Sequence, residues 1–360
     1  MIEKICRKGR RRVKTLQVAL GERSYPIYIG AGSLGAVGAL LRPVWETGRV
    51  VLLADESLRT ETEKLETTLR KEGFSVCTHR VTAGEEGKNG AQYLRLLSEV
   101  ADENAGRDDL LLAFGGGTVG DLAGFVAATY RRGMRYAVLP TTLLAQADSA
   151  VGGKNGLNLP AGKNMVGTFY QPQAVIIDPA LLDTLPEREK ANGMAEVIKC
   201  AMIGDAELFS LLENSEKYAF PTEEVLYRCC ALKAGFVAAD EQDRGARHAL
   251  NFGHTFGHAY ERAYGFSTYA HGEAVAAGMT EMLRIQGERK TAARLEDLLS
   301  RYGLPTHIAC PPDEMRRCLL ADKKNGEQGL TVTEVPQIGT FRLKKTSVDA
   351  LADAYAAEEA

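Results

Sequence analysis

Short apolar runs alternate with helical patterns over the first half of this 360-residue chain. Between several of the runs lie segments with helical periodicity, among them residues 57–71 and 92–100. This alternation is typical of a sheet whose strands are connected by helices. The apolar runs cover residues 13–20, 25–30, 50–54, 74–81, 110–114, 136–139 and 174–177. We therefore predict an α/β domain over residues 16–185.

The second half of the chain has few strand-like runs and consists mainly of successive helical patterns. These patterns cover roughly residues 188–203, 206–212, 223–240, 255–264, 273–289, 292–301 and 313–319. Pro179 and Pro186 frame the expected hinge. We predict an all-α domain over residues 186–360. A cleft between two unlike domains commonly holds a ligand, so we expect the active site there.

Composition argues against several classes of function. The formal net charge is -3, and the chain has no basic surplus that would indicate a nucleic acid or an anionic membrane as partner. No apolar run approaches the roughly 18 residues that cross a bilayer. The seven cysteines include no Cys-x-x-Cys pair and follow no secretory segment, so we expect reduced thiols in the cytoplasm. The expected partner is a small molecule.

A basic leader occupies residues 1–15, where arginines and lysines crowd a segment with few apolar residues. We expect it to be solvated and disordered. A targeting segment is the alternative, but Glu3 and the lack of serines argue against one.

A glycine-rich turn, Gly115–Gly120, follows one apolar run and precedes a helical pattern. Its glycines would let backbone N–H groups approach a phosphate at the start of a helix. The usual dinucleotide motif also needs an acidic residue about 20 positions on and a place in the first βα unit. Both are missing here, so a tight turn without a ligand stays open as the alternative.

Polar residues follow other predicted strands as well. Asp55 ends one strand, Thr141 and Thr142 follow another, and the segment 84–88 (GEEGK) follows a third. Open α/β sheets bind ligands at these strand ends. Each feature alone is typical of a turn or a helix cap, but their recurrence at equivalent places favours a ligand site.

Basic residues also lie on a glycine-rich segment, residues 146–164. Lys154 and Lys163 each stand in a Gly-Lys-Asn triplet, the second of which ends at Asn164, and Asp148 lies nearby. Ammonium groups on such a segment can bind phosphate or carboxylate, because glycine admits close approach. Solvated loop lysines are the alternative, and the repeated triplet favours an anion site.

Histidines cluster in the second half. His254 and His258 are four residues apart and would share one helix face, the spacing of two metal ligands on a helix. Isolated histidines such as His79 and His307 are instead expected to be hydrogen-bonded core residues. Three imidazoles, or two with a carboxylate, would suit catalytic Zn²⁺, and spacing does not choose the third ligand. Four of the six histidines lie within 24 residues: His248, His254, His258 and His271.

Glu196 is the best carboxylate candidate. It is flanked by apolar and small residues on a predicted helix, and such a group is costly to bury unless it is paired or metal-bound. Lys199 lies three residues on and would share its helix face.

Taken together, these segments closely resemble the 3-dehydroquinate synthase family of the shikimate pathway. The resemblance runs in order over residues 16–345 and implies a Rossmann-like NAD-binding domain, an all-α domain and Zn²⁺ in the cleft, with Co²⁺ possible. It also implies a cytoplasmic homodimer. The segments that carry it are GGGTVGDLAGFVAATYRRG, PTTLLAQADSAVGGKNGLNLPAGKN, LPEREKANGMAEVIK, LNFGHTFGHA and HGEAVAAGM.

The resemblance assigns residues to each part of the site. It implies Glu196, His254 and His271 as metal ligands, which moves His258 to the substrate. It also implies that Arg132 reaches the phosphate of the substrate in a neighbouring subunit. The residues expected at NAD are Asp55, Glu85, Lys88, Gly116, Gly117, Thr118, Asp121, Thr141, Thr142, Lys154, Lys163 and Thr184. Those expected at the substrate are Arg132, Asp148, Lys154, Lys163, Asn164, Lys199, Lys233, Arg247, Asn251, His258 and Lys324, with Lys323 as the alternative to Lys324. Those expected to be catalytic are Lys154, Lys199, Asn251 and His258.

The implied reaction converts 3-deoxy-D-arabino-heptulosonate 7-phosphate into 3-dehydroquinate and phosphate, with NAD returned unchanged. Three alternatives remain: another sugar-phosphate cyclase of inosose or valiolone type, a metal-containing NAD-dependent polyol dehydrogenase resembling glycerol dehydrogenase, and a binding module without catalysis. Lys154, Lys163, Lys199 and Lys233 argue against the second, because a neutral polyol gives these cations no anion to bind.

Overall fold

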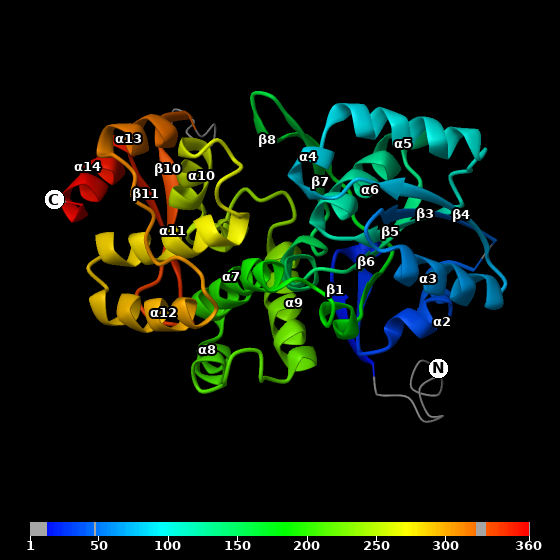
Figure 1. The fold of residues 1–360 in the computed structure, drawn as a ribbon, viewed down its shortest axis with the longest axis horizontal. Helices are drawn as coiled ribbons and strands as arrows, with labels where there is room; N and C mark the ends of the chain where they lie inside the picture. The colour runs from blue at the N-terminus through cyan, green and yellow to red at the C-terminus, as the bar shows by residue number, and fades with distance from the viewer. Residues whose placement is uncertain (1–12, 47, 322–328, 360) are drawn as a thin grey trace. The chain divides into compact units, whose positions relative to one another are not determined.

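The computed structural model describes residues 13–46, 48–321 and 329–359, which fall into two compact units (Figure 1). The first unit comprises the chain up to Leu185 together with Thr222–Ala238, and the second comprises Pro186–Pro221 and Ala239–Ala360. A single boundary after residue 185 is therefore wrong for residues 222–238. Most of the basic leader, together with Lys323 and Lys324, lies outside the described residues.

The first unit is built on a sheet of seven strands in the order β1-β2-β9-β6-β5-β3-β4. Neighbouring strands pair in parallel except β1 with β2, which are antiparallel. Every apolar run predicted as a strand forms one, because buried parallel strands read as nearly continuous apolar sequence. The strands are β1 (Lys14–Val18), β2 (Tyr25–Ile29), β3 (Arg49–Asp55), β4 (Ser75–Val81), β5 (Leu110–Gly115), β6 (Arg135–Pro140) and β9 (Val175–Ile177). The predicted leader is thus shorter than expected, since Lys14 already belongs to β1.

Three helices of the first unit, α3 (Arg59–Lys71), α5 (Gly90–Asp102) and α6 (Gly117–Thr129), pack against this sheet. In α3 the buried residues Thr62, Leu65 and Leu69 are spaced three and four apart, which places them on one face of the helix. Trp45 stacks on Phe74 with ring centroids 5.1 Å apart, and both belong to the same buried apolar cluster as residues of β3 and β5. The helices are α2 (Val37–Leu41), α3 (Arg59–Lys71), α4 (Gly84–Gly87), α5 (Gly90–Asp102), α6 (Gly117–Thr129) and α9 (Thr222–Ala239).

The glycine-rich segment after β6 is a hairpin and not only a loop. Its strands β7 (Lys154–Leu159) and β8 (Gly162–Phe169) pair antiparallel, with Gly156 opposite Gly167. A Cβ atom on either glycine would lie 2.3 Å from a carbonyl oxygen of the facing strand. These two glycines therefore allow the strands to approach, a role that composition alone does not separate from anion binding.

The second unit is helical, as predicted, and also contains a two-stranded sheet that the sequence did not indicate. Its helices are α7 (Glu187–Gly204), α8 (Ala206–Glu213), η6 (Ala246–Asn251), α10 (His254–Ala263), α11 (His271–Ile285), α12 (Arg289–Arg301), α13 (Pro312–Ala321) and α14 (Val348–Glu358). Strands β10 (Leu330–Glu334) and β11 (Arg342–Thr346) pair antiparallel. Among the described residues, no helix is both long and apolar enough to cross a membrane.

Close helix packing brings the starts of α10 and α11 to α7. A Cβ atom on Gly278 of α11 would lie 2.1 Å from the carbonyl oxygen of Gly253, and one on Gly272 would lie 2.1 Å from that of Asn192 in α7. Gly253, which precedes α10, has a φ of 79° that glycine adopts without strain. These glycines therefore fix where the first residues of α10 and α11 lie.

Candidate active site

Three donor side chains converge in the helical unit. Glu196 lies in the middle of α7, His254 is the first residue of α10, and His271 is the first residue of α11. The Nε2 atoms of His254 and His271 lie 3.5 and 3.4 Å from Oε1 of Glu196. One ligand atom from each residue lies within 4.8 Å of the other two. The structure thus brings together the three residues that the family resemblance implied as ligands.

Glu196 is a buried carboxylate in a cationic environment. Its side chain is fully buried, and neither oxygen forms a regular hydrogen bond. Lys199, which is 1% exposed, forms an ion pair with it from one helical turn away. Burial alone would raise the pKa of Glu196, but Lys199 and His271 outweigh burial and lower that pKa to about 2. The carboxylate is therefore ionised at neutral pH and available to a cation.

The two imidazoles are oriented by their other nitrogen atoms. The Nδ1 atom of His254 lies 3.2 Å from the carbonyl oxygen of Phe252, and Nδ1 of His271 lies 3.4 Å from Oε1 of Glu261. Glu261 is 2% exposed and sits on α10. Such partners fix a metal-binding histidine so that its free nitrogen faces the ion. Sequence reasoning missed Glu261, although its place three residues after His258 puts both on one helix face.

The donor set fits a divalent transition ion. One carboxylate oxygen and two imidazole nitrogens, with a position left open, are the donors of a catalytic Zn²⁺ site. Burial lowers the pKa of His271, but Glu196 and Glu261 outweigh burial and raise it to about 10 when no ion is bound. The two carboxylates thus favour a positive charge at this imidazole.

His258 lies beside this group but not in it. Its ring centroid is 5.4 Å from that of His254 and 6.2 Å from that of His271. With Glu261 and His271 it forms a second close group of donors. The assignment of His258 to the substrate therefore stays a prediction. A pocket lies along this side of the unit, lined by His248, Asn251, His254, Thr255, His258, Gly329, Leu330 and Thr331.

Two further substrate candidates of the helical unit, Arg247 and Lys199, are buried. Arg247 of η6 is 2% exposed, and its Nη1 donates to the carbonyl oxygen of Glu241 at 2.8 Å. Lys199 faces Glu196, as described above. Both cations are thus positioned by the protein before any substrate binds.

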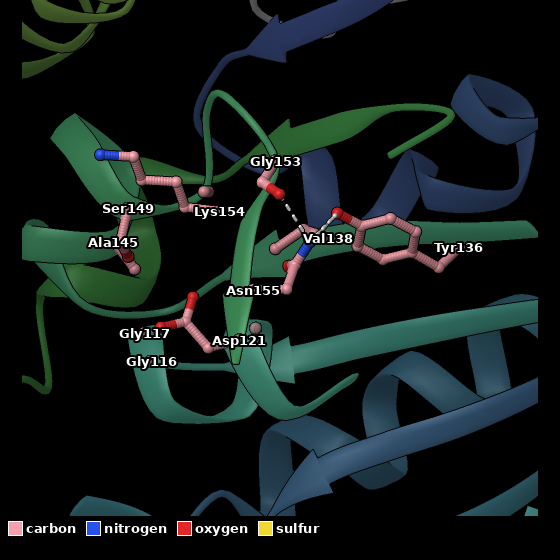
Figure 2. A pocket seen from close by; sticks show the side chains of 12 residues that line it. Gly116, Gly117, Asp121, Tyr136, Val138, Ala145, Ser149, Gly153, Lys154 and Asn155 are labelled. Carbon is pink, nitrogen blue, oxygen red and sulfur yellow. Dashed lines mark hydrogen bonds between the residues drawn. The ribbon is translucent and has the colours of Figure 1, made fainter. Parts of the chain in front are cut away.

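In the sheet unit, the predicted phosphate-binding residues lie at the carboxyl ends of the parallel strands. Gly116 and Gly117 lie between the end of β5 and the first turn of α6, and they line a small pocket (Figure 2). The carboxylate of Asp121 lies beside them in this view, while Lys154 and Asn155 point to opposite sides of β7. The remaining lining residues are Gly120, Tyr136, Val138, Ala145, Ser149, Ala150 and Gly153.

A polar network joins the hairpin to α4 and α6. The Nζ atom of Lys88 lies 2.5 Å from Asp121 and 2.5 Å from Oδ1 of Asn164. Glu85 accepts a hydrogen bond of 2.6 Å from Asn158 and lies 3.9 Å from Nζ of Lys163. Five of the predicted NAD and substrate residues thus meet here: Glu85, Lys88, Asp121, Lys163 and Asn164.

A second ion pair links α9 to the segment after β6. Lys233 is buried, and its Nζ donates to the carbonyl oxygen of Asp148 and contacts the Asp148 carboxylate, both at 2.7 Å. Thr142 accepts from the N–H of Ala145, and Thr141 donates its N–H to Gly115. These contacts hold the strand-end segments in place.

Four further candidates have more local surroundings. Asp55 accepts hydrogen bonds from the N–H and hydroxyl of Ser57, so it caps the turn after β3. Thr184 and Arg132 are exposed, and Arg132 has a left-handed backbone with φ of 63°. Thr118 donates to the carbonyl oxygen of Gly84 at 3.2 Å. The ligand roles of these four residues stay predictions.

The fold and these residues define a class: an α/β unit with a glycine-rich strand end, joined to a helical unit that holds donors for a divalent cation. Comparison with known sequences identifies the family within this class. The descriptions "3-dehydroquinate synthase N-terminal" and "3-dehydroquinate synthase C-terminal" match residues 78–192 and 193–325. A 3-dehydroquinate synthase of Citrifermentans bemidjiense is 40% identical over 347 residues, which cover 92% of this chain and 94% of that protein. The chain therefore belongs to the 3-dehydroquinate synthase family.

Solved structures share the fold over nearly the whole chain. The 2-epi-5-epi-valiolone synthase from Streptomyces hygroscopicus subsp. jinggangensis 5008, with NAD⁺ and Zn²⁺ bound, has a TM-score of 0.84 at 27% identity and covers 97% of this chain and 99% of its own. A 2-deoxy-scyllo-inosose synthase with carbaglucose-6-phosphate, NAD⁺ and Co²⁺ has a TM-score of 0.84 at 24% identity and covers 95% and 99%. The predicted fold class, an α/β unit followed by a helical unit, is confirmed.

Proposed function

We propose that this chain converts 3-deoxy-D-arabino-heptulosonate 7-phosphate into 3-dehydroquinate and phosphate, as a carbon–oxygen lyase. The steps are transient oxidation at C5, elimination of phosphate, re-reduction, ring opening and intramolecular aldol closure. The observation that carries the proposal is the donor group formed by the buried Glu196 and the half-buried His254 and His271 in a chain of this family.

The proposed cofactors are NAD and a divalent ion, Zn²⁺ or Co²⁺, held by Glu196, His254 and His271. When bound, NAD would accept and return the hydride, and the ion would polarise the C5 oxygen. Support comes from the two solved cyclases, which hold NAD⁺ with Zn²⁺ and NAD⁺ with Co²⁺. The residues proposed to bind NAD are Asp55, Glu85, Lys88, Gly116, Gly117, Thr118, Asp121, Thr141, Thr142, Lys154, Lys163 and Thr184.

The chain's own cations would bind the two anionic groups of the substrate. A phosphate ester carries about two negative charges at neutral pH, and the sugar acid adds a carboxylate. Lys154 and Lys163 stand on the hairpin, and Lys233 is held beside Asp148. Arg247 is pre-positioned in the helical unit. This set of cations favours a sugar phosphate over a neutral polyol, because a phosphate and a carboxylate can accept charge-assisted hydrogen bonds from ammonium and guanidinium groups and a polyol carries no such charge.

We propose that Asn251 and His258 accept or relay the proton of the C5 hydroxyl. Both line the pocket that also contains the metal candidate His254. An imidazole titrates near neutral pH in its ordinary state, so it can accept this proton and release it. Lys199, ion-paired to Glu196, would keep that carboxylate ionised throughout the cycle.

The deciding experiment measures phosphate release from the heptulosonate phosphate by the full chain, with and without NAD and with EDTA as control. We expect release that requires NAD and stops when the metal is chelated, with no net accumulation of NADH. Net NADH would indicate a dehydrogenase instead. Release from glucose 6-phosphate or sedoheptulose 7-phosphate alone would indicate a cyclase of inosose or valiolone type.

We further propose that the enzyme is a cytoplasmic homodimer. The exposed guanidinium of Arg132, on a left-handed turn after α6, would then be free to reach phosphate bound by a neighbouring subunit. Light scattering on the purified chain tests this assembly. A monomer that retains full phosphate release would contradict it.

A further inference from the structure

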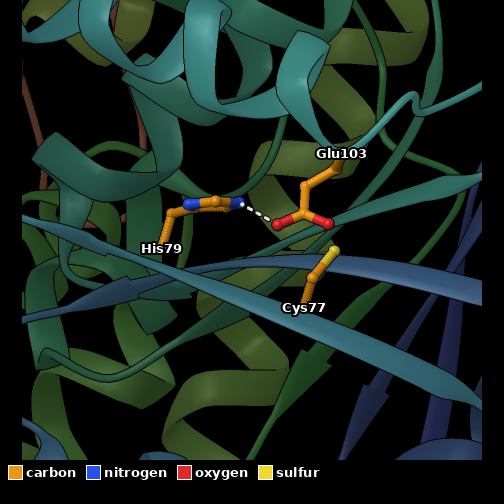
Figure 3. A group of neighbouring side chains, drawn as sticks. All are labelled: Cys77, His79 and Glu103. Carbon is orange, nitrogen blue, oxygen red and sulfur yellow. Dashed lines mark ion pairs between the residues drawn. The ribbon is translucent and has the colours of Figure 1, made fainter.

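A second group of metal-binding side chains lies at the edge of the sheet, formed by Cys77, His79 and Glu103 (Figure 3). Cys77 and His79 are two residues apart on β4, so they project from the same face of the strand. Strand β4 is outermost in the sheet, and α5, which ends just before Glu103, packs against it. One ligand atom from each of the three lies within 4.8 Å of the other two.

The spacing between His79 and Glu103 suits a shared ion better than a hydrogen bond, while the Cys77 thiol donates to the carbonyl oxygen of Val50 at 3.6 Å. The Nε2 atom of His79 lies 3.5 Å from Oε1 of Glu103, and this buried nitrogen forms no hydrogen bond. An N–H···O hydrogen bond spans roughly 2.7–3.2 Å. Two ligands on a tetrahedral zinc ion, with bonds of about 2.0 Å, are separated by about 3.3 Å.

The other nitrogen of His79 faces a second carboxylate. Its Nδ1 atom lies 3.4 Å from Oε2 of Glu99, which precedes Glu103 by one turn of α5. Arg95 holds the other oxygen of Glu99 at 2.6 Å. A carboxylate on one ring nitrogen, with the opposite nitrogen directed at an ion, is the usual arrangement of a histidine ligand.

The donor types specify the class of ion. Thiol sulfur, imidazole nitrogen and a single carboxylate oxygen suit Zn²⁺ and similar transition ions, whereas Mg²⁺ and Ca²⁺ prefer oxygen alone. Arg49 donates to the main-chain carbonyl of Glu103 at 2.5 Å and lies 4.0 Å from Asp109. Burial, and then Glu103, raise the pKa of the Cys77 thiol to about 11, and the nearby charge of Arg49 opposes this rise.

We propose that Cys77, His79 and Glu103 form a second metal site, for Zn²⁺ or a closely similar transition ion, with water as fourth ligand and Glu99 orienting His79. Its ligands come from β4 and from the end of α5, both in the first unit. The ion would therefore join the outermost strand to the helix that packs against it. The site is structural and takes no part in the proposed reaction.

Cobalt absorption distinguishes this site from the donor group on α7, α10 and α11. A cysteine thiolate on Co²⁺ gives a charge-transfer band in the near ultraviolet, and the group of Glu196, His254 and His271 contains no sulfur. The full chain, stripped of metal with a chelator, is titrated with Co²⁺ at micromolar concentration. We expect about two equivalents to bind and the thiolate band to appear.

Variants assign the band. Cys77→Ser should abolish the thiolate band and lower the number of bound Co²⁺ ions by one. His79→Gln should weaken Co²⁺ binding at this second site by at least about tenfold. Cys318→Ser is the matched control, because Cys318 contacts Glu314 at 3.3 Å but belongs to no group of three donors among the described residues. It should keep the band.

A band that survives Cys77→Ser, or its absence from the unaltered chain, overturns this proposal. Circular dichroism of each variant shows whether the fold is retained, and His79→Gln supplies a second test if Cys77→Ser unfolds. Phosphate release measured in parallel should be unchanged in Cys77→Ser. Loss of the second site and failure of the proposed function are therefore separate outcomes.

Discussion

The two groups of donors differ in what surrounds them, although each offers three ligands. In the helical unit, Glu196 is fully buried, and its oxygens have no regular hydrogen bonds. In the sheet unit, Cys77, His79 and Glu103 are all half-buried, and two of them stand on the outermost strand β4. A buried carboxylate without cations is costly, whereas a half-buried group can be solvated. The two groups therefore differ chiefly at the carboxylate, which is fully buried beside Lys199 in one and half-buried in the other.

The largest effect is expected from removing a ligand of the buried group. His271→Ala should lose bound Zn²⁺ and lower phosphate release by about 10³-fold or more, because the ion's polarising contribution of several kcal/mol is lost. Atomic absorption and a phosphate assay measure the two quantities. His248→Ala is the control, since His248 belongs to no group of three donors among the described residues. Full metal content in His271→Ala would remove this residue from the ligand set.

A smaller loss is expected at His258, which is proposed to move a proton and not to hold the ion. His258→Ala should slow turnover by about 10²- to 10³-fold with the metal retained. His248→Ala, in the same pocket, is the matched control. If His258→Ala instead loses the metal, the ligands are better described by the alternative group of His258, Glu261 and His271.

Glu261 tests whether the buried group depends on its supporting carboxylate. Glu261→Gln removes the charge that faces Nδ1 of His271 and should weaken Zn²⁺ binding by about 10- to 100-fold while the fold is kept. Competition with a chromogenic chelator measures the affinity. The control is Glu273→Gln, on the same helix α11 as His271. It removes a charge that is paired with Arg188 of α7 and should leave the Zn²⁺ affinity unchanged. Equal losses in both variants would mean that α11 is simply destabilised.

Glu281 offers a comparison with Glu196. Both carboxyl groups are buried, but the neighbour of Glu281 is the carboxylate of Glu359, whereas the neighbour of Glu196 is the ammonium group of Lys199. Burial, and then Glu359, raise the pKa of Glu281 from 4.5 to about 7. The folded chain therefore binds this proton more tightly than the unfolded chain, and stability present below pH 4.5 is lost as pH rises towards 7. Glu281→Gln should add about 2–3 kcal/mol to the free energy of unfolding at pH 8 and almost nothing at pH 4.5. Urea denaturation at both pH values measures this, and an equal effect at the two would exclude titration as its cause.

Sequence predicted the sheet better than the hairpin, for a physical reason. Strands such as β5 are buried on both faces and read as continuous apolar runs, LLLAFG in this case. Strands β7 and β8 are short of apolar side chains and rich in glycine, so their pairing depends on main-chain approach that composition does not reveal. The sheet of β10 and β11 was missed for a similar reason, because β11 reads RLKKT and is largely exposed.

The candidate site was only partly accessible from residue spacing. Spacing within α10 favoured His254 with His258, since a helix face is a local property. The meeting of His254 with His271 and Glu196 depends on packing between α7, α10 and α11, and only the family resemblance indicated it. Cys77 and Glu103 lie on different elements, so their meeting could not be predicted at all.

The return of α9 to the first unit has a consequence for how the chain can be divided. The backbone passes from one unit to the other three times, after residues 185, 221 and 238. A fragment ending at Leu185 would lack Lys233 and leave Asp148 without its ion pair. Neither unit can therefore be cut out as one continuous piece, and exchange of one unit between relatives would require several simultaneous joins.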